Sequence, residues 1–117
     1  MAKFALLLNH APDRYEGLSE DEMMAIIKDY VAWVESMAAK GLYHGGEKLA
    51  PGPGATLSKR DGQFEVHDSP YAELAEVLGG FMIIEAENLE AAIELAKGHP
   101  HFTYNPSLTI HEVGDTA

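Results

Sequence analysis

The sequence predicts a single α+β domain with a ferredoxin-like fold, and three observations support this. Strand and helix patterns alternate in the order β-α-β-β-α-β, which is typical of one antiparallel sheet with both helices on one face. A β-hairpin is inserted in the middle of this order. The chain has 117 residues, of which 46% are hydrophobic and 23% are charged, and this composition suits one globular domain over residues 1–117.

The N-terminal elements have clear boundaries in the sequence. Residues 3–8 are apolar and are followed by polar residues, which predicts a buried strand. Ser19 and Glu22 have the spacing of a capping box, in which each side chain satisfies a free backbone amide at a helix start. Apolar residues then recur at helical spacing until Lys40 and Gly41, where a cation and a glycine favour a helix end.

The middle of the chain is predicted to be rich in strands. Residues 42–49 favour a strand, with a bulge or a close approach of the backbone at the glycine pair 45–46. Residues 56–60 and 63–67 flank an Asp-Gly pair, which is the strongest hairpin signal in the sequence. Residues 72–77 are expected to form one helical turn.

The C-terminal part repeats the strand and helix pattern. The apolar run 81–84 predicts a core strand. Asn88 is a good N-cap for a helix that ends near Gly98, and residues 107–113 complete the order as a final strand. Two helices cover one face of such a sheet, so a second copy of the chain is expected to cover the other face in a homodimer.

Charge and composition exclude several classes of function. The formal net charge is -11 with a pI near 4.8, which disfavours nucleic acids and anionic membrane surfaces as partners. The chain has no cysteine, so thiolate metal sites, iron–sulfur clusters and cysteine nucleophiles are excluded. Its apolar runs are only about five residues long, far short of the roughly 18 that a membrane-spanning helix needs. We expect a cytoplasmic protein without a cofactor.

The order and spacing of several short segments resemble the YCII-related family, specifically the branch named after an Asp-Gly-Pro-Phe (DGPF) signature. The segments that carry the resemblance are 18–23, 41–42, 46–49, 68–73, 78–81, 84–97 and 100–101. The signature here has Ser69 and Tyr71 in place of Gly and Phe. The resemblance implies a ferredoxin-like fold that dimerises as in the dimeric α/β-barrel superfamily.

Asp68 and His101 are the candidate catalytic residues. Asp68 follows a hairpin strand, where it serves either as a general base or as a turn residue. The resemblance marks His101 above the other histidines, and family members are suspected of enzymatic activity because of a His/Asp pair. Pairing with Asp68 would raise the pKa of His101 and fix its tautomer, whereas the alternative is a solvent-facing loop histidine.

His44, Glu47 and Tyr71 are the candidate substrate-binding residues. His99 and His101 have a His-x-His spacing, with His44, Glu47 or His10 as further conceivable metal ligands, but no established ligand motif is present and we predict no metal site.

Two functions remain open from the sequence. The first is a small-molecule enzyme with an acid–base pair in a pocket near the dimer interface. The second is a non-enzymatic ligand-binding or regulatory dimer, because some relatives are fused to transcription initiation factors.

Overall fold

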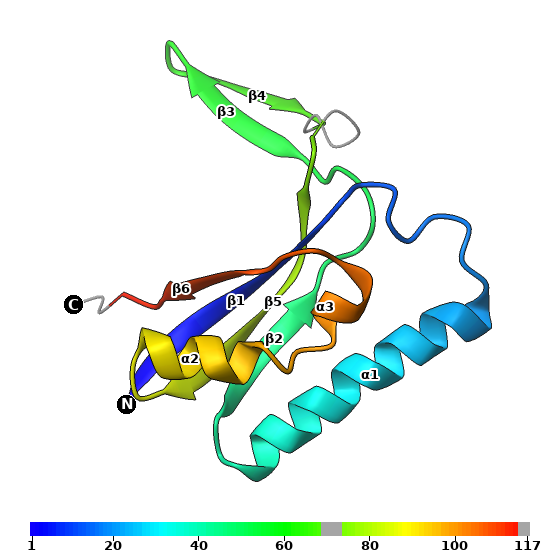
Figure 1. Cartoon of the computed structure of the whole chain (residues 1–117). Helices are drawn as coiled ribbons and strands as arrows, with labels where there is room; N and C mark the ends of the chain where they lie inside the picture. Colours follow the sequence, from blue (N-terminus) through cyan, green and yellow to red (C-terminus); the bar gives the residue numbers. More distant parts are fainter. Residues whose placement is uncertain (69–73, 115–117) are drawn as a thin grey trace.

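The computed structural model describes residues 1–68 and 74–114 and shows an α+β protein built on an antiparallel sheet (Figure 1). The elements, in chain order, are β1 Ala2–His10, α1 Glu20–Ala39, β2 Tyr43–Lys48, β3 Thr56–Arg60, β4 Gln63–His67, β5 Val77–Ala86, α2 Leu89–Ala96, α3 His101–Tyr104 and β6 Thr109–Glu112. Four of the strands form one sheet in the order β2-β5-β1-β6, in which every neighbouring pair is antiparallel. This arrangement is compatible with the predicted ferredoxin-like plait.

The helices α1 and α2 cover one face of this sheet. Alternation along β1 and β5 directs Phe4, Leu6 and Ile84 to that face, where they are fully buried against Met37 of α1 and Ala92 of α2. Burial of these side chains is the main favourable term in the stability of the fold. No helix in the described ranges is both long and apolar enough to cross a membrane.

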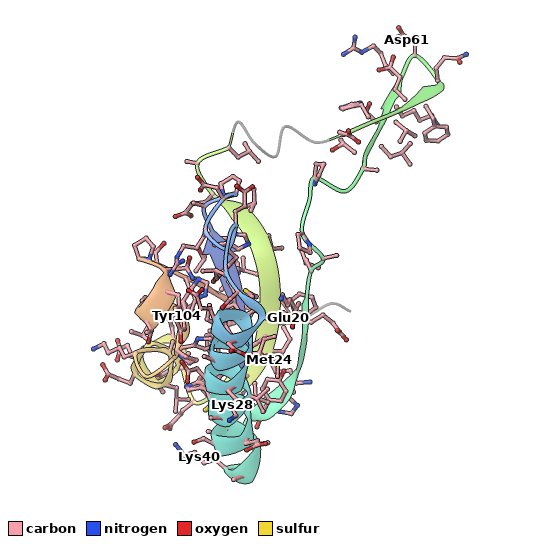
Figure 2. All side chains as sticks on the ribbon, turned by 90° about the vertical axis from the view of Figure 1, so that its right-hand side faces the viewer. Glu20, Met24, Lys28, Lys40, Asp61 and Tyr104 are labelled. Atoms are coloured by element: carbon pink, nitrogen blue, oxygen red, sulfur yellow. The ribbon has the colours of Figure 1, made fainter. Side chains whose placement is uncertain are left out.

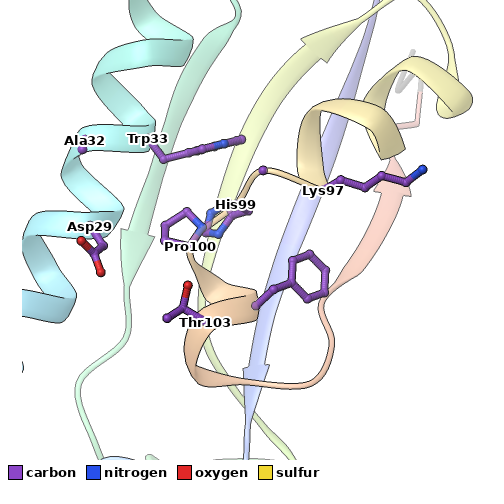
Figure 3. Close-up of a pocket in the computed structure, with 9 residues that line it drawn as sticks. Asp29, Ala32, Trp33, Lys97, His99, Pro100 and Thr103 are labelled. Atoms are coloured by element: carbon purple, nitrogen blue, oxygen red, sulfur yellow. The ribbon is translucent and has the colours of Figure 1, made fainter.

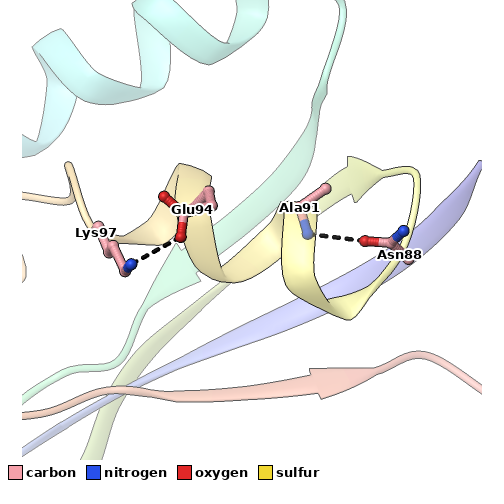
Figure 4. Close-up of polar contacts among 4 residues, drawn as sticks. All are labelled: Asn88, Ala91, Glu94 and Lys97. Atoms are coloured by element: carbon pink, nitrogen blue, oxygen red, sulfur yellow. Dashed lines mark hydrogen bonds and ion pairs between the residues drawn. The ribbon is translucent and has the colours of Figure 1, made fainter.

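The starts of both long helices are confirmed in detail. The hydroxyl of Ser19 accepts a hydrogen bond from the Glu22 amide at 3.1 Å, and the Glu22 carboxylate accepts one from the Ser19 amide at 3.1 Å. The side chain of Asn88 accepts a hydrogen bond from the Ala91 amide at 2.9 Å at the start of α2 (Figure 4). Each cap satisfies amides that have no partner within the helix.

Strands β3 and β4 form a separate two-stranded ribbon, which we call the arm. Asp61 and Gly62 both have positive φ angles, 51° and 78°, which suit the tight turn that an Asp-Gly pair favours. The arm leaves the body between β2 and β5, and Figure 2 shows it standing away from the body with Asp61 at its tip.

Two local predictions were wrong. Residues 74–77 do not form a helical turn, because Val77 is already part of β5, where it pairs with His10. The predicted turn at residues 72 and 73 lies outside the described residues. The connection after α2 contains a short helix, α3, that the sequence did not predict.

No helix within residues 1–68 and 74–114 covers the second face of the sheet (Figure 1). We call it the open face. The pairing registers place Leu7 beside Phe81 and Ala5 beside Ile83 at its centre, all half-buried. Glu47 lies next to Phe81 at one edge of the face. An apolar centre with polar edges is typical of a face that another layer covers.

Candidate functional site

His101 lies at the start of α3 and is only 1% exposed, so the alternative of a solvent-facing loop histidine is wrong. Its Nε2 lies 2.8 Å from the backbone oxygen of Asn9, and its Nδ1 lies 2.6 Å from the hydroxyl of Tyr30. A carbonyl oxygen only accepts hydrogen bonds, so Nε2 carries the proton and Nδ1 accepts from Tyr30. Both ring nitrogens are therefore already occupied.

His99 belongs to the same hydrogen-bond network as His101. Its Nδ1 accepts a hydrogen bond from the His101 amide at 2.9 Å, so its Nε2 carries the proton and faces the Met82 sulfur at 3.4 Å. Burial, and to a smaller extent His101, lower the pKa of His99 to about 4. Burial also lowers the pKa of His101. Both imidazoles are thus neutral at pH 7.

An open cleft of about 660 Å³ lies beside His99, between α1 and the segment that follows α2 (Figure 3). Its lining includes Asp29, Trp33, His99 and Thr103. The rings of Trp33 and His99 pack with their centroids 4.4 Å apart, so His99 is held by aromatic packing as well as by hydrogen bonds. The hydroxyl of Tyr104 donates to Asp29 at the edge of α1.

The Asp68–His101 pair stays a prediction. Asp68 directly follows β4 and is exposed, whereas His101 is buried beneath α1. Within the described residues, the His101 ring forms hydrogen bonds with Tyr30, with Asn9 and, at 3.4 Å, with Asn105. The predicted substrate residue Tyr71 lies outside the described residues.

The two other predicted substrate residues, His44 and Glu47, both lie on the open face. Pairing of Tyr43 with Ile84 packs the Tyr43 side chain against the core, so alternation turns His44 to the open face. There its Nε2 lies 3.0 Å from Oε1 of Glu85. The side chains of His44 and Glu85 are 33% and 27% exposed. Glu47 lies further along the same strand.

Glu85 is a site residue that sequence reasoning missed. It lies between Ile84 and Ala86, which are both buried in the core, so strand alternation places its carboxylate on the open face. That alternation was visible in the sequence, but its pairing with His44 depends on the register of β2 against β5. This register is shifted by a bulge between Tyr43 and Gly46, as the glycine pair predicted.

Gly46 and Gly80 allow β2 and β5 to approach closely beside this pair. A Cβ atom on Gly46 would clash with the carbonyl oxygen of Phe81, and one on Gly80 would lie 2.8 Å from that of Glu47. Among the residues that the structure describes, no three His, Asp or Glu side chains converge on a point where they would hold a metal ion.

The model of the YCII-related domain matches residues 2–111, which is nearly the whole chain. A search of curated proteins finds no match.

Proposed function

The chain belongs to the YCII-related family, and on this premise we propose that it is a homodimeric enzyme that transfers a proton to or from a small molecule on the open face. The observation that carries the proposal is the His44–Glu85 pair, 3.0 Å apart. In this role a carboxylate holds one nitrogen of the imidazole, and the other nitrogen exchanges a proton with the substrate.

The geometry of the pair suits this role better than that of His101. Glu85 binds Nε2 of His44, and among the described residues no hydrogen bond involves Nδ1, which is thus the atom that meets a substrate. His101, in contrast, would have to give up its bond with Tyr30 before Nδ1 could accept a proton from a substrate. That exchange would leave a buried polar group without a partner, at a cost of about 1 to 3 kcal/mol.

A second copy on the open face would turn this exposed pair into an enclosed site. Leu7, Phe81 and Ile83 form the apolar centre that the partner would cover. A cover of this kind excludes water, and the fields of Glu85 and Glu47 then act more strongly on a bound molecule. The two carboxylates favour a substrate with a hydrogen-bond donor or a positive charge, and the apolar centre favours a substrate with an apolar body.

The apolar centre also favours a second function, a ligand-binding dimer without catalysis. Such a pocket binds a small molecule through burial alone, and the His44–Glu85 pair at its edge would then only orient the ligand. In this second function, binding of the small molecule would regulate a protein partner of the dimer.

Native mass spectrometry of untagged protein tests both functions. We expect a dimer that carries an additional small mass, which denaturation releases for identification. The released molecule, or close analogues of it, is then incubated with the wild type and with the His44→Gln variant. Conversion by the wild type that falls at least 100-fold in the variant supports the enzyme, because general acid–base catalysis typically contributes 10²–10⁴-fold.

Return of the molecule unchanged, with equal binding by both proteins, identifies the binding module instead. A monomer at micromolar concentration would overturn both functions, because the pocket needs the second copy. Glu22→Gln is the matched control, since Glu22 is an exposed carboxylate at the start of α1 and leaves the open face untouched.

A further inference from the structure

The arm has one apolar face that the body leaves uncovered. The pairs Leu57–Val66 and Lys59–Phe64 lie on the same face of the ribbon, because they are two residues apart along each strand. Leu57, Phe64 and Val66 are 63%, 66% and 69% exposed. The opposite face carries polar side chains such as Ser58 and Glu65. This alternation is typical of a sheet with one buried face.

Stability of the arm depends on what covers this face. Within the described ranges, β3 and β4 have their principal contacts with each other and with no other element. An isolated two-stranded ribbon is marginally stable at best in water, and a third layer on its apolar side is what normally stabilises it. Exposed apolar patches of this kind mark interaction surfaces.

The arm points toward the place where the proposed second copy would lie. Figure 2 shows the arm and its tip residue Asp61 on the side of the sheet opposite to α2 and Tyr104. That is the side of the open face. A five-residue strand spans about 17 Å, whereas two sheets packed face to face lie about 10 Å apart. The tip of the arm would therefore pass the partner's sheet and reach its helical layer.

The helix α1 carries a surface in that layer that complements the arm. Met24, Ile27 and Val31 follow each other at spacings of three and four residues, so they form one stripe, and they are 57%, 40% and 47% exposed. The exposed acidic residues Glu20 and Glu35 lie on the same side of the helix, next to this stripe. The apolar face of the arm carries a cation near its tip, where Lys59 pairs with Phe64.

We propose that the arm is a clasp between two copies of this chain, in which its apolar face packs on the α1 stripe of the partner. The inference rests on the proposed dimer and extends it. Two arms and two stripes satisfy each other reciprocally in a two-fold pair, as in any isologous interface. The apolar contact supplies the affinity, and the charge of Lys59, which lies on the apolar face of the arm, favours a register that brings it near Glu20 or Glu35.

A cysteine cross-link tests the contact directly, because the wild-type chain has no cysteine. Val66→Cys and Val31→Cys proteins are prepared separately, mixed so that subunits exchange, and treated with a short bismaleimide. We expect a cross-linked dimer whose linked peptides contain positions 66 and 31. Glu65→Cys is the matched control, because position 65 lies on the opposite face of the arm, and we expect at least tenfold less product from it.

Sedimentation velocity gives a second, independent measurement. The variant Leu57→Thr/Phe64→Thr/Val66→Thr keeps residues that favour strands but removes the apolar face. We expect its dimer to dissociate at a concentration at least tenfold higher than that of the wild type, with an unchanged circular dichroism spectrum. The variant Ser58→Thr/Glu65→Gln on the polar face should match the wild type.

The outcomes separate this inference from the proposed function. A wild-type dimer that the triple variant does not weaken, together with no 66–31 cross-link, overturns the clasp and leaves the dimer intact. A wild type that is monomeric overturns the dimer and the clasp together.

Discussion

Tyr30 and His101 form the most sensitive polar contact of the core. The Tyr30 hydroxyl donates to Nδ1 of His101 over 2.6 Å, and burial raises the pKa of this tyrosine well above its ordinary value. The hydroxyl therefore stays protonated and remains a donor at neutral pH. The imidazole in turn connects α3 to the end of β1 through the Asn9 carbonyl.

Tyr30→Phe is expected to lower the free energy of unfolding by about 1 to 3 kcal/mol, because Nδ1 of His101 loses its closest donor in a buried place. Urea unfolding followed by circular dichroism measures this loss. Tyr104→Phe is the matched control, since it removes a hydroxyl that bonds the exposed Asp29, and we expect a clearly smaller loss. Equal losses in the two variants would contradict the role given to Tyr30.

His99 makes stability depend on pH in a defined direction. Its pKa is about 4 in the folded protein and near 6.5 when unfolded, so the unfolded chain binds the additional proton between these values. Stability from this group is complete above pH 6.5 and is lost as the pH falls toward 4. Its full size is at most about 3 kcal/mol.

The measurement compares the wild type with His99→Gln in urea at pH 7.5 and at pH 4.5. We expect the wild type to lose more free energy of unfolding between the two pH values than the variant does. Identical pH slopes would show that His99 titrates in the folded protein much as it does when unfolded.

Individual residues could be predicted from the sequence where the residue type pointed to a role, but not where the role depends on a partner far away along the chain. His101 stood out and lies in a polar network, and His44 and Glu47 lie on one face of β2, where their role in substrate binding stays a prediction. Tyr30 and Glu85 were missed, because their partners are 71 and 41 residues away along the chain. Such pairs depend on helix placement and strand register, which composition and spacing do not determine.

The glycine pair in β2 shows what a strand needs in order to position the His44–Glu85 pair. Gly46 lies directly against the Phe81 carbonyl of β5, so no side chain fits there. The neighbouring bulge sets the register that brings His44 to Glu85.

Gly46→Ala is expected to destabilise the protein by about 1 to 3 kcal/mol, because the methyl group forces β2 away from β5. Thermal unfolding measures the change. Gly114→Ala is the control with no expected effect, since a Cβ atom there meets nothing within 4 Å. A neutral Gly46→Ala variant would show that the two strands separate without cost.

Elements with local signals were predicted well, and those with only tertiary signals were not. The capping box of α1 and the Asp-Gly turn of the arm depend on residues within four positions of each other, and both are present. The short α3 has no side-chain cap and only four residues, so its helical form depends on the packing of His101 beneath α1.

The whole molecule carries a charge that opposes its own dimerisation. Two chains of formal charge -11 repel each other, and the few cations near the tip of each arm offset only a small part of that repulsion. Salt screens such repulsion, since the Debye length falls from about 30 Å at 10 mM to about 10 Å at 100 mM.

We therefore expect the dimer to tighten as salt is added. Its dissociation constant, measured by sedimentation equilibrium at neutral pH, should fall several-fold between about 10 and 100 mM sodium chloride. Weakening over this range would show instead that contacts between opposite charges dominate the interface.

The arm leaves and rejoins the body at nearly the same point. Lys48 at the end of β2 pairs with Gly80 of β5, and the amide of Leu49 donates to the carbonyl of Gly79 at 2.9 Å. The two strands would therefore remain neighbours if a short turn joined them, so residues 50–76 are a detour that the sheet does not require. Substitutions in this segment, or its replacement by a short turn, should therefore leave the fold of the sheet and its helices unchanged. The residues that determine the fold of the sheet are thus separate in the sequence from the residues of the arm that would contact a second copy.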